Sequence, residues 1–251
     1  VHARCRPYSH FQYSEVIPDV VGSFVAMTDL NLTFGSEDIV EYGKPLRPSA
    51  LAEPPAVVFA LEPDRSSMTL HTLLMVDPDA PFRDTPTEGE WVHWLVYDIP
   101  GNHTALGKTL VEYAAPKPRK CPKNERLCLK EHRITFILWE QPHGPIDLQP
   151  EDTRLAAAIA ANKGQARAGY KARDFAARHR LGLHIGLNFL ETWHDPNDGS
   201  FYQVPWYHVR DESLGQVSHL VPHVERPRAA SKAASKTAGK ASSKAAKKDE
   251  L

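Results

Sequence analysis

Two carboxylates and two imidazoles are the side chains of this chain whose types and spacing best suit chemistry. Asp77 and Asp79 lie in the run Asp-Pro-Asp-Ala-Pro, and His93 and His132 each open an apolar segment. Prolines at that density fix the backbone, so the carboxylates are held in place. A carboxylate beside a histidine fixes its tautomer and raises its pKa, which leaves an N–H donor for an anion. If these segments meet, the sequence predicts a pocket for a small anion, such as a phosphate or carboxylate head group.

Structural roles explain the same residues when each is taken alone. A histidine that opens a strand often serves only as a hydrogen bonder, and Asp-Pro-Asp often forms a turn, because Asp side chains bond their own backbone. Glu90 and Arg133 are interpreted as structural, with Glu90 paired to Arg83 or Arg133, and Trp91 as either core or pocket wall. Four histidines outside the motifs are interpreted as surface residues, namely His71, His103, His143 and His194.

The hydrophobic pattern predicts the elements that must position these side chains. Many strands and few late helices indicate a mostly β fold with peripheral helices. The expected strands cover 55–61, 69–76, 91–99, 132–139 and 183–191, and the expected helices cover 151–162 and 171–180. Residues 1–20 are expected to be irregular. Strict alternation in strand 91–99 places one set of side chains on one face, namely Trp91, His93, Leu95 and Tyr97.

The distribution of charge excludes one class of partner. The net charge is −1, but residues 226–251 hold eight Lys and Arg against two acids and so carry +6, which leaves −7 on residues 1–225. Nucleic-acid binding by such an acidic body is not expected, because it lacks a basic face. No segment is apolar over the roughly 20 residues of a transmembrane helix, so none is expected. The Lys-, Ala- and Ser-rich tail 226–251 is expected to be disordered, because it has little apolar surface to bury.

Several features predict residence in the lumen of the endoplasmic reticulum. Asn31 and Asn102 lie in Asn-x-Thr sequons and are candidate glycosylation sites. The tail ends in a tetrapeptide that is typical of retention through the KDEL receptor, formed by Lys248, Asp249, Glu250 and Leu251.

The three cysteines leave two pairings open. In an oxidising lumen Cys121 and Cys128 are candidates for a disulfide that closes a short loop, and Cys5 bonded to one of them is the alternative. A metal is not expected, because the chain lacks Cys-x-x-Cys and paired-histidine motifs. No cofactor is expected either, because no phosphate-binding loop is present.

The order of four motifs resembles the phosphatidylethanolamine-binding protein family, which includes Raf kinase inhibitor-like proteins. The resemblance covers about residues 20–210 and implies a domain over 21–225, with a large antiparallel sheet packed on a smaller one. The motifs are Asp77–Pro81 with Glu90–His93, Tyr113–Pro118, His132–Arg133 and Arg173–Leu183. It implies that the anion pocket is lined by Asp77, Asp79, Pro81, Trp91, His93, Pro116, Pro118 and His132.

The chain departs from the family pattern around His132. Ile134 stands where many members place a pocket Tyr, although members of the flowering-control branch also have an aliphatic residue there. Lys130 replaces the usual Gly two residues before the His, and the preceding loop 119–130 carries extra residues and two cysteines. We expect the mouth of the pocket to be reshaped, so that the ligand differs from that of other members.

Three functions follow from the resemblance. The first is a lumenal binding protein whose partner is a small anion, a phospholipid head group or a lumenal protein. The second is a biosynthetic enzyme or accessory protein acting on carboxylate or anhydride metabolites, as in maleidride-type dimerisation, with His93, His132 and Asp77 as its catalytic residues. The third is an inhibitor of a lumenal or vacuolar protease. A binding or regulatory protein is preferred to an enzyme, although the same residues serve both functions, and no Ser-His-Asp or Cys-His order supports a hydrolase.

Overall fold

The chain forms two compact units, residues 1–202 and 203–251. The domain over 21–225 that the sequence predicts stays a prediction. The second unit contains one described antiparallel pair, β10 (Trp206–His208) with β11 (Leu220–Pro222). The computed structural model describes residues 6–22, 27–61, 68–120, 131–161, 164–182, 184–194, 206–208 and 220–222. Cys5, Cys121, Cys128 and the tail 226–251 lie outside these residues, so the predictions for them stay predictions.

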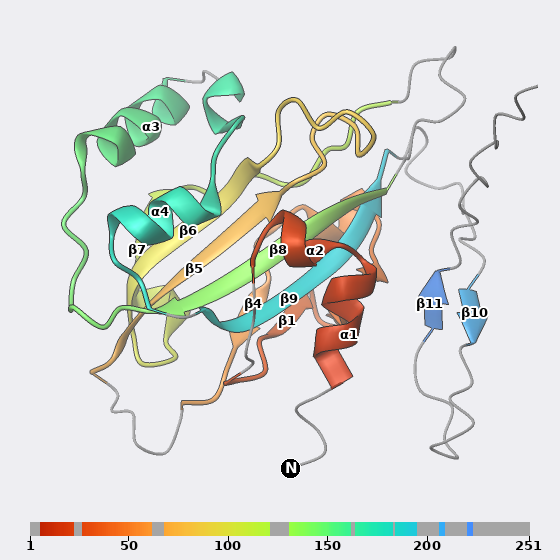
Figure 1. The fold of residues 1–251 in the computed structure, drawn as a ribbon, viewed down its shortest axis with the longest axis horizontal. Coiled ribbons are helices and arrows are strands. Elements are labelled where there is room, and N and C mark those ends of the chain that lie inside the picture. Colours follow the sequence, from red (N-terminus) through yellow and green to blue (C-terminus); the bar gives the residue numbers. More distant parts are fainter. Residues whose placement is uncertain are drawn as a thin grey trace, which may run out of the picture. The chain divides into compact units, whose positions relative to one another are not determined.

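Two sheets form the first unit (Figure 1). The large sheet has the strand order β3-β9-β8-β5-β6-β7, and its neighbours are antiparallel except for β3 beside β9. The small sheet has the order β2-β1-β4. A mostly β fold with a large antiparallel sheet and a smaller one is thus confirmed. The strands of the large sheet are β3 (Lys44–Pro45), β5 (Leu70–Asp77), β6 (Trp91–Pro100), β7 (Lys108–Val111), β8 (Glu131–Glu140) and β9 (His184–Trp193), and those of the small sheet are β1 (Asn31–Phe34), β2 (Asp38–Ile39) and β4 (Ala56–Val58).

The central strands are apolar on both faces because each face of the large sheet packs against another layer. Alternate residues of β5 enter two cores. Leu74 and Val76 pack in a helix-side core with Phe175 of α4 (Ala172–Arg178). Leu73 and Met75 pack in a sheet-side core with residues of β1, including Leu32 and Phe34. The large sheet is therefore the middle layer, and its strand ends are held rigidly from both sides.

Helices contribute side chains to the helix-side core. The two late helices that the sequence predicts are present as α3 (Pro150–Ala160) and α4, and α3 begins with a capping box formed by Gln149 and Asp152. The prediction of an irregular N-terminus was wrong, because α1 (Arg6–Tyr13) and α2 (Val16–Asp19) form there and bury Phe11 and Val16 completely. Short 3-10 turns lie at η2 (Pro48–Leu51), η3 (Thr104–Leu106) and η4 (Gly164–Arg167).

Strand β6 does not alternate strictly, and the predicted set of residues on one face was wrong. Met75 pairs with Trp94 while Val76 pairs with Val92, which leaves His93 as an extra residue in a β-bulge. Leu95 consequently packs in the helix-side core, and Trp94 packs against the sheet-side core. A bulge re-aims the side chains around it, and here it lies at a candidate site residue.

Two further expectations concern the surface and the membrane. His71 was expected at the surface, but it is buried with its ring centroid 5.2 Å from that of Phe59. His103 and His143 are exposed, and His194 is half-buried. Within the described ranges, no helix combines the length and the apolar character needed to cross a bilayer.

Candidate functional site

Three strand ends meet at one edge of the large sheet. Asp77 at the end of β5 pairs with Trp91 at the start of β6. On the other side of β5, Val76 pairs with Thr135 of β8, which brings the start of β8 to the same edge. His132 and Asp77 are then in contact, with 2.7 Å between His132 Nδ1 and Asp77 Oδ2. Residues separated by 55 positions in the sequence thus form one pair, as the pattern of strand ends predicts.

The Asp77–His132 pair is buried and oriented. Oδ1 of Asp77 accepts the backbone N–H of Asp79 at 2.8 Å, which fixes the carboxylate in an Asx-type turn. Burial lowers the pKa of His132, but the hydrogen bond and the negative charge of Asp77 outweigh it and leave that pKa above its ordinary value. Because Nδ1 donates to Asp77, a protonated His132 presents its second N–H, at Nε2, to a ligand.

His93 has the opposite character. Its Nδ1 lies 2.7 Å from the carbonyl oxygen of Ala114, and because a carbonyl only accepts, Nδ1 carries the proton. Burial lowers the pKa of His93, and the nearby Asp77 only partly opposes this. The neutral ring therefore offers a lone pair at Nε2, which is buried and has no hydrogen-bond partner among the residues that the structure describes.

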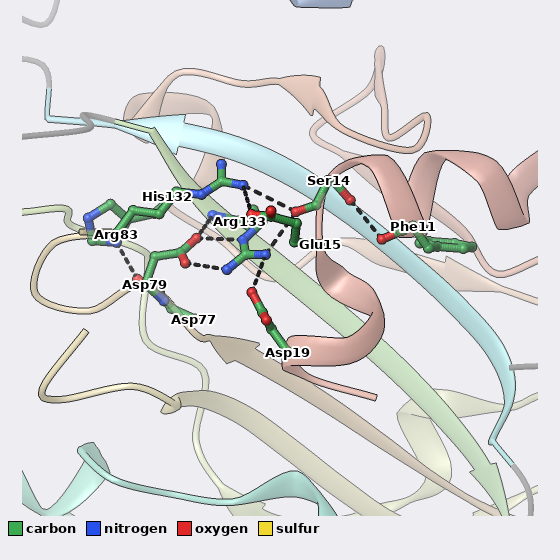
Figure 2. A network of polar contacts seen from close by, with 9 residues as sticks. All are labelled: Phe11, Ser14, Glu15, Asp19, Asp77, Asp79, Arg83, His132 and Arg133. Carbon is green, nitrogen blue, oxygen red and sulfur yellow. Dashed lines mark hydrogen bonds and ion pairs between the residues drawn. The ribbon is translucent and has the colours of Figure 1, made fainter. Parts of the chain in front are cut away.

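Asp79 is used by Arg133 in this structure (Figure 2). Its Oδ1 accepts Arg133 Nη2 at 2.6 Å, and its Oδ2 accepts both the backbone N–H and Nε of Arg133, at 2.8 and 2.9 Å. Arg133 Nη1 in turn donates to the Ser14 carbonyl at 2.8 Å and to Asp19 at 2.9 Å. The structural interpretation of Arg133 fits this geometry, and the ligand contact predicted for Asp79 stays a prediction.

The other predicted site residues, three prolines and a Trp, differ in their burial. Pro116 and Pro118 are buried, whereas Pro81 and Trp91 are half-buried. The Pro116–Pro118 segment is anchored at both ends, because the Ala114 carbonyl bonds His93 and the Pro118 carbonyl accepts His194 Nδ1 at 3.1 Å. This loop therefore runs along the site from β6 to the end of β9. Among the described residues, the structure brings together Asp77, His93, His132 and the proline loop.

Glu90 and Ile134 have structural contacts. Glu90 accepts the backbone N–H of Ala172 at 2.8 Å and thereby caps α4, instead of pairing with Arg83 or Arg133. Ile134, at the position of a pocket Tyr in many family members, is fully buried in the sheet-side core.

Sequence reasoning missed Arg167, which lies in η4. Its Nη1 donates to the carbonyls of Val92 and His93, both at 3.0 Å, and its Nη2 donates to the carbonyl of Glu112 at 2.9 Å. It fastens the backbone of the bulge that carries His93 to the strand after it. Every residue has a backbone carbonyl, so no sequence motif indicates this contact.

Comparisons with known proteins agree with the fold and with the motifs. A family model described as Phosphatidylethanolamine-binding protein matches residues 36–189. Protein MOTHER of FT and TFL1 homolog 2 of Oryza sativa subsp. japonica is 32% identical over 185 residues, which cover 72% of this chain and 90% of that protein. Protein BROTHER of FT and TFL 1 of Arabidopsis thaliana is 38% identical over 127 residues, which cover 50% of this chain and 65% of that protein.

Solved structures show the same fold. The carboxypeptidase Y inhibitor, crystallised with its cognate proteinase, superposes with a TM-score of 0.59 at 22% identity, over 76% of this chain and 96% of that chain. The phosphatidylethanolamine-binding protein from Plasmodium vivax gives 0.53 at 19% identity, over 74% of this chain and 97% of that chain. At such identities the likeness concerns the fold alone, while the family model and the relative from rice extend it to the sequence. This chain belongs to the phosphatidylethanolamine-binding protein family.

Proposed function

We propose that the protein binds a small molecule through a phosphate or carboxylate group, at the site formed by Asp77, His93 and His132. The observation that carries the proposal is the Nε2 atom of His93, which is buried beside the Asp77–His132 pair and has no hydrogen-bond partner among the described residues. An unsatisfied buried polar atom costs about 1–3 kcal/mol, so native proteins keep few of them without a use.

The two histidines offer complementary hydrogen bonds. Nε2 of a protonated His132 donates an N–H to an anionic oxygen, and Nε2 of neutral His93 accepts a proton or an O–H from the ligand. A protonated phosphate or carboxyl group supplies both partners, and once its proton has passed to His93 the remaining anionic oxygens accept an N–H from each imidazole. The adjoining Pro116 and Pro118 are buried, which limits competing water.

Calorimetric titration tests this proposal. Methyl phosphate and succinate are titrated into the wild-type protein, His93→Ala and the control His143→Ala, whose imidazole is exposed and outside the site. We expect binding by the wild type and by the control, and a loss of at least tenfold in His93→Ala. Equal affinity in all three proteins would remove His93 from the site, and no binding of either probe would refute the proposal.

Proton-transfer catalysis is the second candidate. The environments of His93 and His132 push their pKa values in opposite directions, which is the arrangement of a general base beside a general acid. The substrate class would be a carboxylate or anhydride metabolite, with His93 taking a proton. Incubation with a cyclic anhydride should then give coupled product in the wild type and none in His93→Ala. Turnover equal to that in buffer counts against catalysis.

We place this function in the lumen of the endoplasmic reticulum as part of the proposal. The support is the tetrapeptide Lys248–Leu251 and the exposure of both sequon residues, Asn31 and Asn102. Deletion of residues 248–251 should cause secretion of the protein from cells. Unchanged retention after the deletion would refute the address.

A further inference from the structure

The charges at the site nearly cancel without one further residue. Asp77 offsets a protonated His132, and Asp79 offsets Arg133, which also pairs with Asp19. His93 is neutral, because burial lowers its pKa. An anion that entered this set of groups would meet no net positive charge. Anion binding therefore calls for another cation within reach.

Arg83 is that cation. It follows the Asp77–Pro81 motif in the loop between β5 and β6, and Figure 2 shows its side chain beside His132 and Arg133. Its positive charge lowers the pKa of His132 and partly opposes the rise that burial causes in the pKa of Glu191, so it acts on both sides of the site. The sequence motifs did not indicate a cation for the anion site.

The guanidinium of Arg83 is only lightly engaged. Nη2 donates to the Ser14 carbonyl at 3.1 Å and lies 3.9 Å from Glu15 Oε2, which is too long for a hydrogen bond. In the described part of the chain, its Nε and Nη1 have no hydrogen-bond partner, and 19% of the side chain is exposed. Arg133, in contrast, uses Nε, Nη1 and Nη2 on Asp79, Ser14 and Asp19.

We propose that Arg83 is a specificity-determining residue of the anion site, and that it makes the site prefer a dianionic phosphate monoester to a singly charged phosphodiester or monocarboxylate. The inference rests on the proposed function. Arg83 supplies a further positive charge and a planar set of N–H donors, whose fork matches two oxygens of a phosphate. The His132 N–H takes a third oxygen, so a ligand with a second negative charge gains most.

The test compares two ligands of similar size in variants of one chain. Methyl phosphate and dimethyl phosphate are titrated by calorimetry at pH 7 into the wild type, Arg83→Gln, Arg83→Lys and Arg154→Gln. Arg154 is exposed on α3 and lies 3.8 Å from Glu151, its ion-pair partner in the described part of the chain, so its variant has the same change in net charge away from the site. Thermal unfolding of each variant confirms that it folds.

We expect Arg83→Gln to lose about tenfold or more in affinity for methyl phosphate, the value of one charge-assisted hydrogen bond, and little for dimethyl phosphate. Arg154→Gln should match the wild type, and Arg83→Lys should recover part of the loss. NMR titration should also show a higher pKa for His132 in Arg83→Gln, because the positive charge that lowers this pKa is removed. Wild-type binding that is unchanged in Arg83→Gln overturns this inference alone, whereas absence of wild-type binding overturns the proposed function.

Discussion

The ion pair between Asp79 and Arg133 should be the most expensive polar contact to break near the site. Asp79 is 1% exposed and Arg133 is 3% exposed. In Asp79→Asn the guanidinium loses a carboxylate that accepts two of its N–H groups, and the new amide N–H₂ faces a cation. Removing one partner of a buried pair costs about 3–5 kcal/mol. Because Arg133 keeps Ser14 and Asp19, we expect the lower end, about 3 kcal/mol.

Urea denaturation followed by circular dichroism measures this cost. A loss of about 3 kcal/mol corresponds to a fall in Tm of about 6–12 °C for a domain of this size. Asp19→Asn is the matched control, since it removes a carboxylate from the same guanidinium at a half-exposed position. An exposed pair contributes less than about 1 kcal/mol, so the control should change stability little.

A double-mutant cycle shows whether the pair itself is responsible. Arg133→Met alone leaves Asp79 as a buried charge without its partner, so it should also be destabilising. The double variant Asp79→Asn/Arg133→Met should lose clearly less stability than the sum of the two single variants, because it contains no buried charge whose partner has been removed. Additive losses, or an Asp79→Asn variant as stable as Asp19→Asn, would refute the reasoning.

Three other outcomes are expected. Burial raises the pKa of Glu90 from 4.5 to about 7. The stability that this group contributes is therefore complete below pH 4.5 and is lost, by about 3 kcal/mol, as the pH rises through 7. Glu90→Gln should flatten this dependence of stability on pH in urea titrations between pH 5 and 8. Gly89→Ala would place its Cβ 2.1 Å from the carbonyl oxygen of Pro78, so a loss of about 3 kcal/mol or more is expected from chemical denaturation, and wild-type stability would show that the loop has room. If the protein is lumenal, we expect glycosylation at Asn31 and not at Asn102, because the Asn102 amide donates to the Phe59 carbonyl at 3.2 Å. Glycosidase treatment should then shift the electrophoretic mobility of the wild type but not of Asn31→Gln. A residual shift in Asn31→Gln contradicts this assignment.

The sequence predicted the parts of the fold that depend on long apolar patterns. The strands around Leu73–Val76 and Ile134–Leu138 bury both faces, so they appear as continuous apolar runs whatever their partners are. The N-terminal helices could not be predicted in this way. Their stability comes from burying Phe11 and Val16 and from arginines of β8 and α4, including Arg133 and Arg173, which are far away in the sequence.

At the candidate site, the meeting of two strand ends was predictable from the sequence, and most of the other bonding was not. The motif spacing placed Asp77 and His132 at strand ends, and their contact follows from antiparallel pairing. The bulge at His93 was invisible, because an extra residue in a strand changes no letter of the pattern. The assignment of Asp79 to Arg133 was equally hidden, since a carboxylate at a strand end can serve a ligand or a neighbouring cation.

The contacts of Arg133 with the N-terminal segment affect the order in which the chain can fold. Its contacts with Ser14 and Asp19 join residues 119 and 114 positions apart. During synthesis the N-terminal helices therefore emerge long before the guanidinium that holds them exists. Contacts of such long range slow folding, because the intervening loop must close first. We expect α1 and α2 to dock only after β8 has entered the sheet, so the contacts of Arg133 with the N-terminal helices should form as a late event of folding.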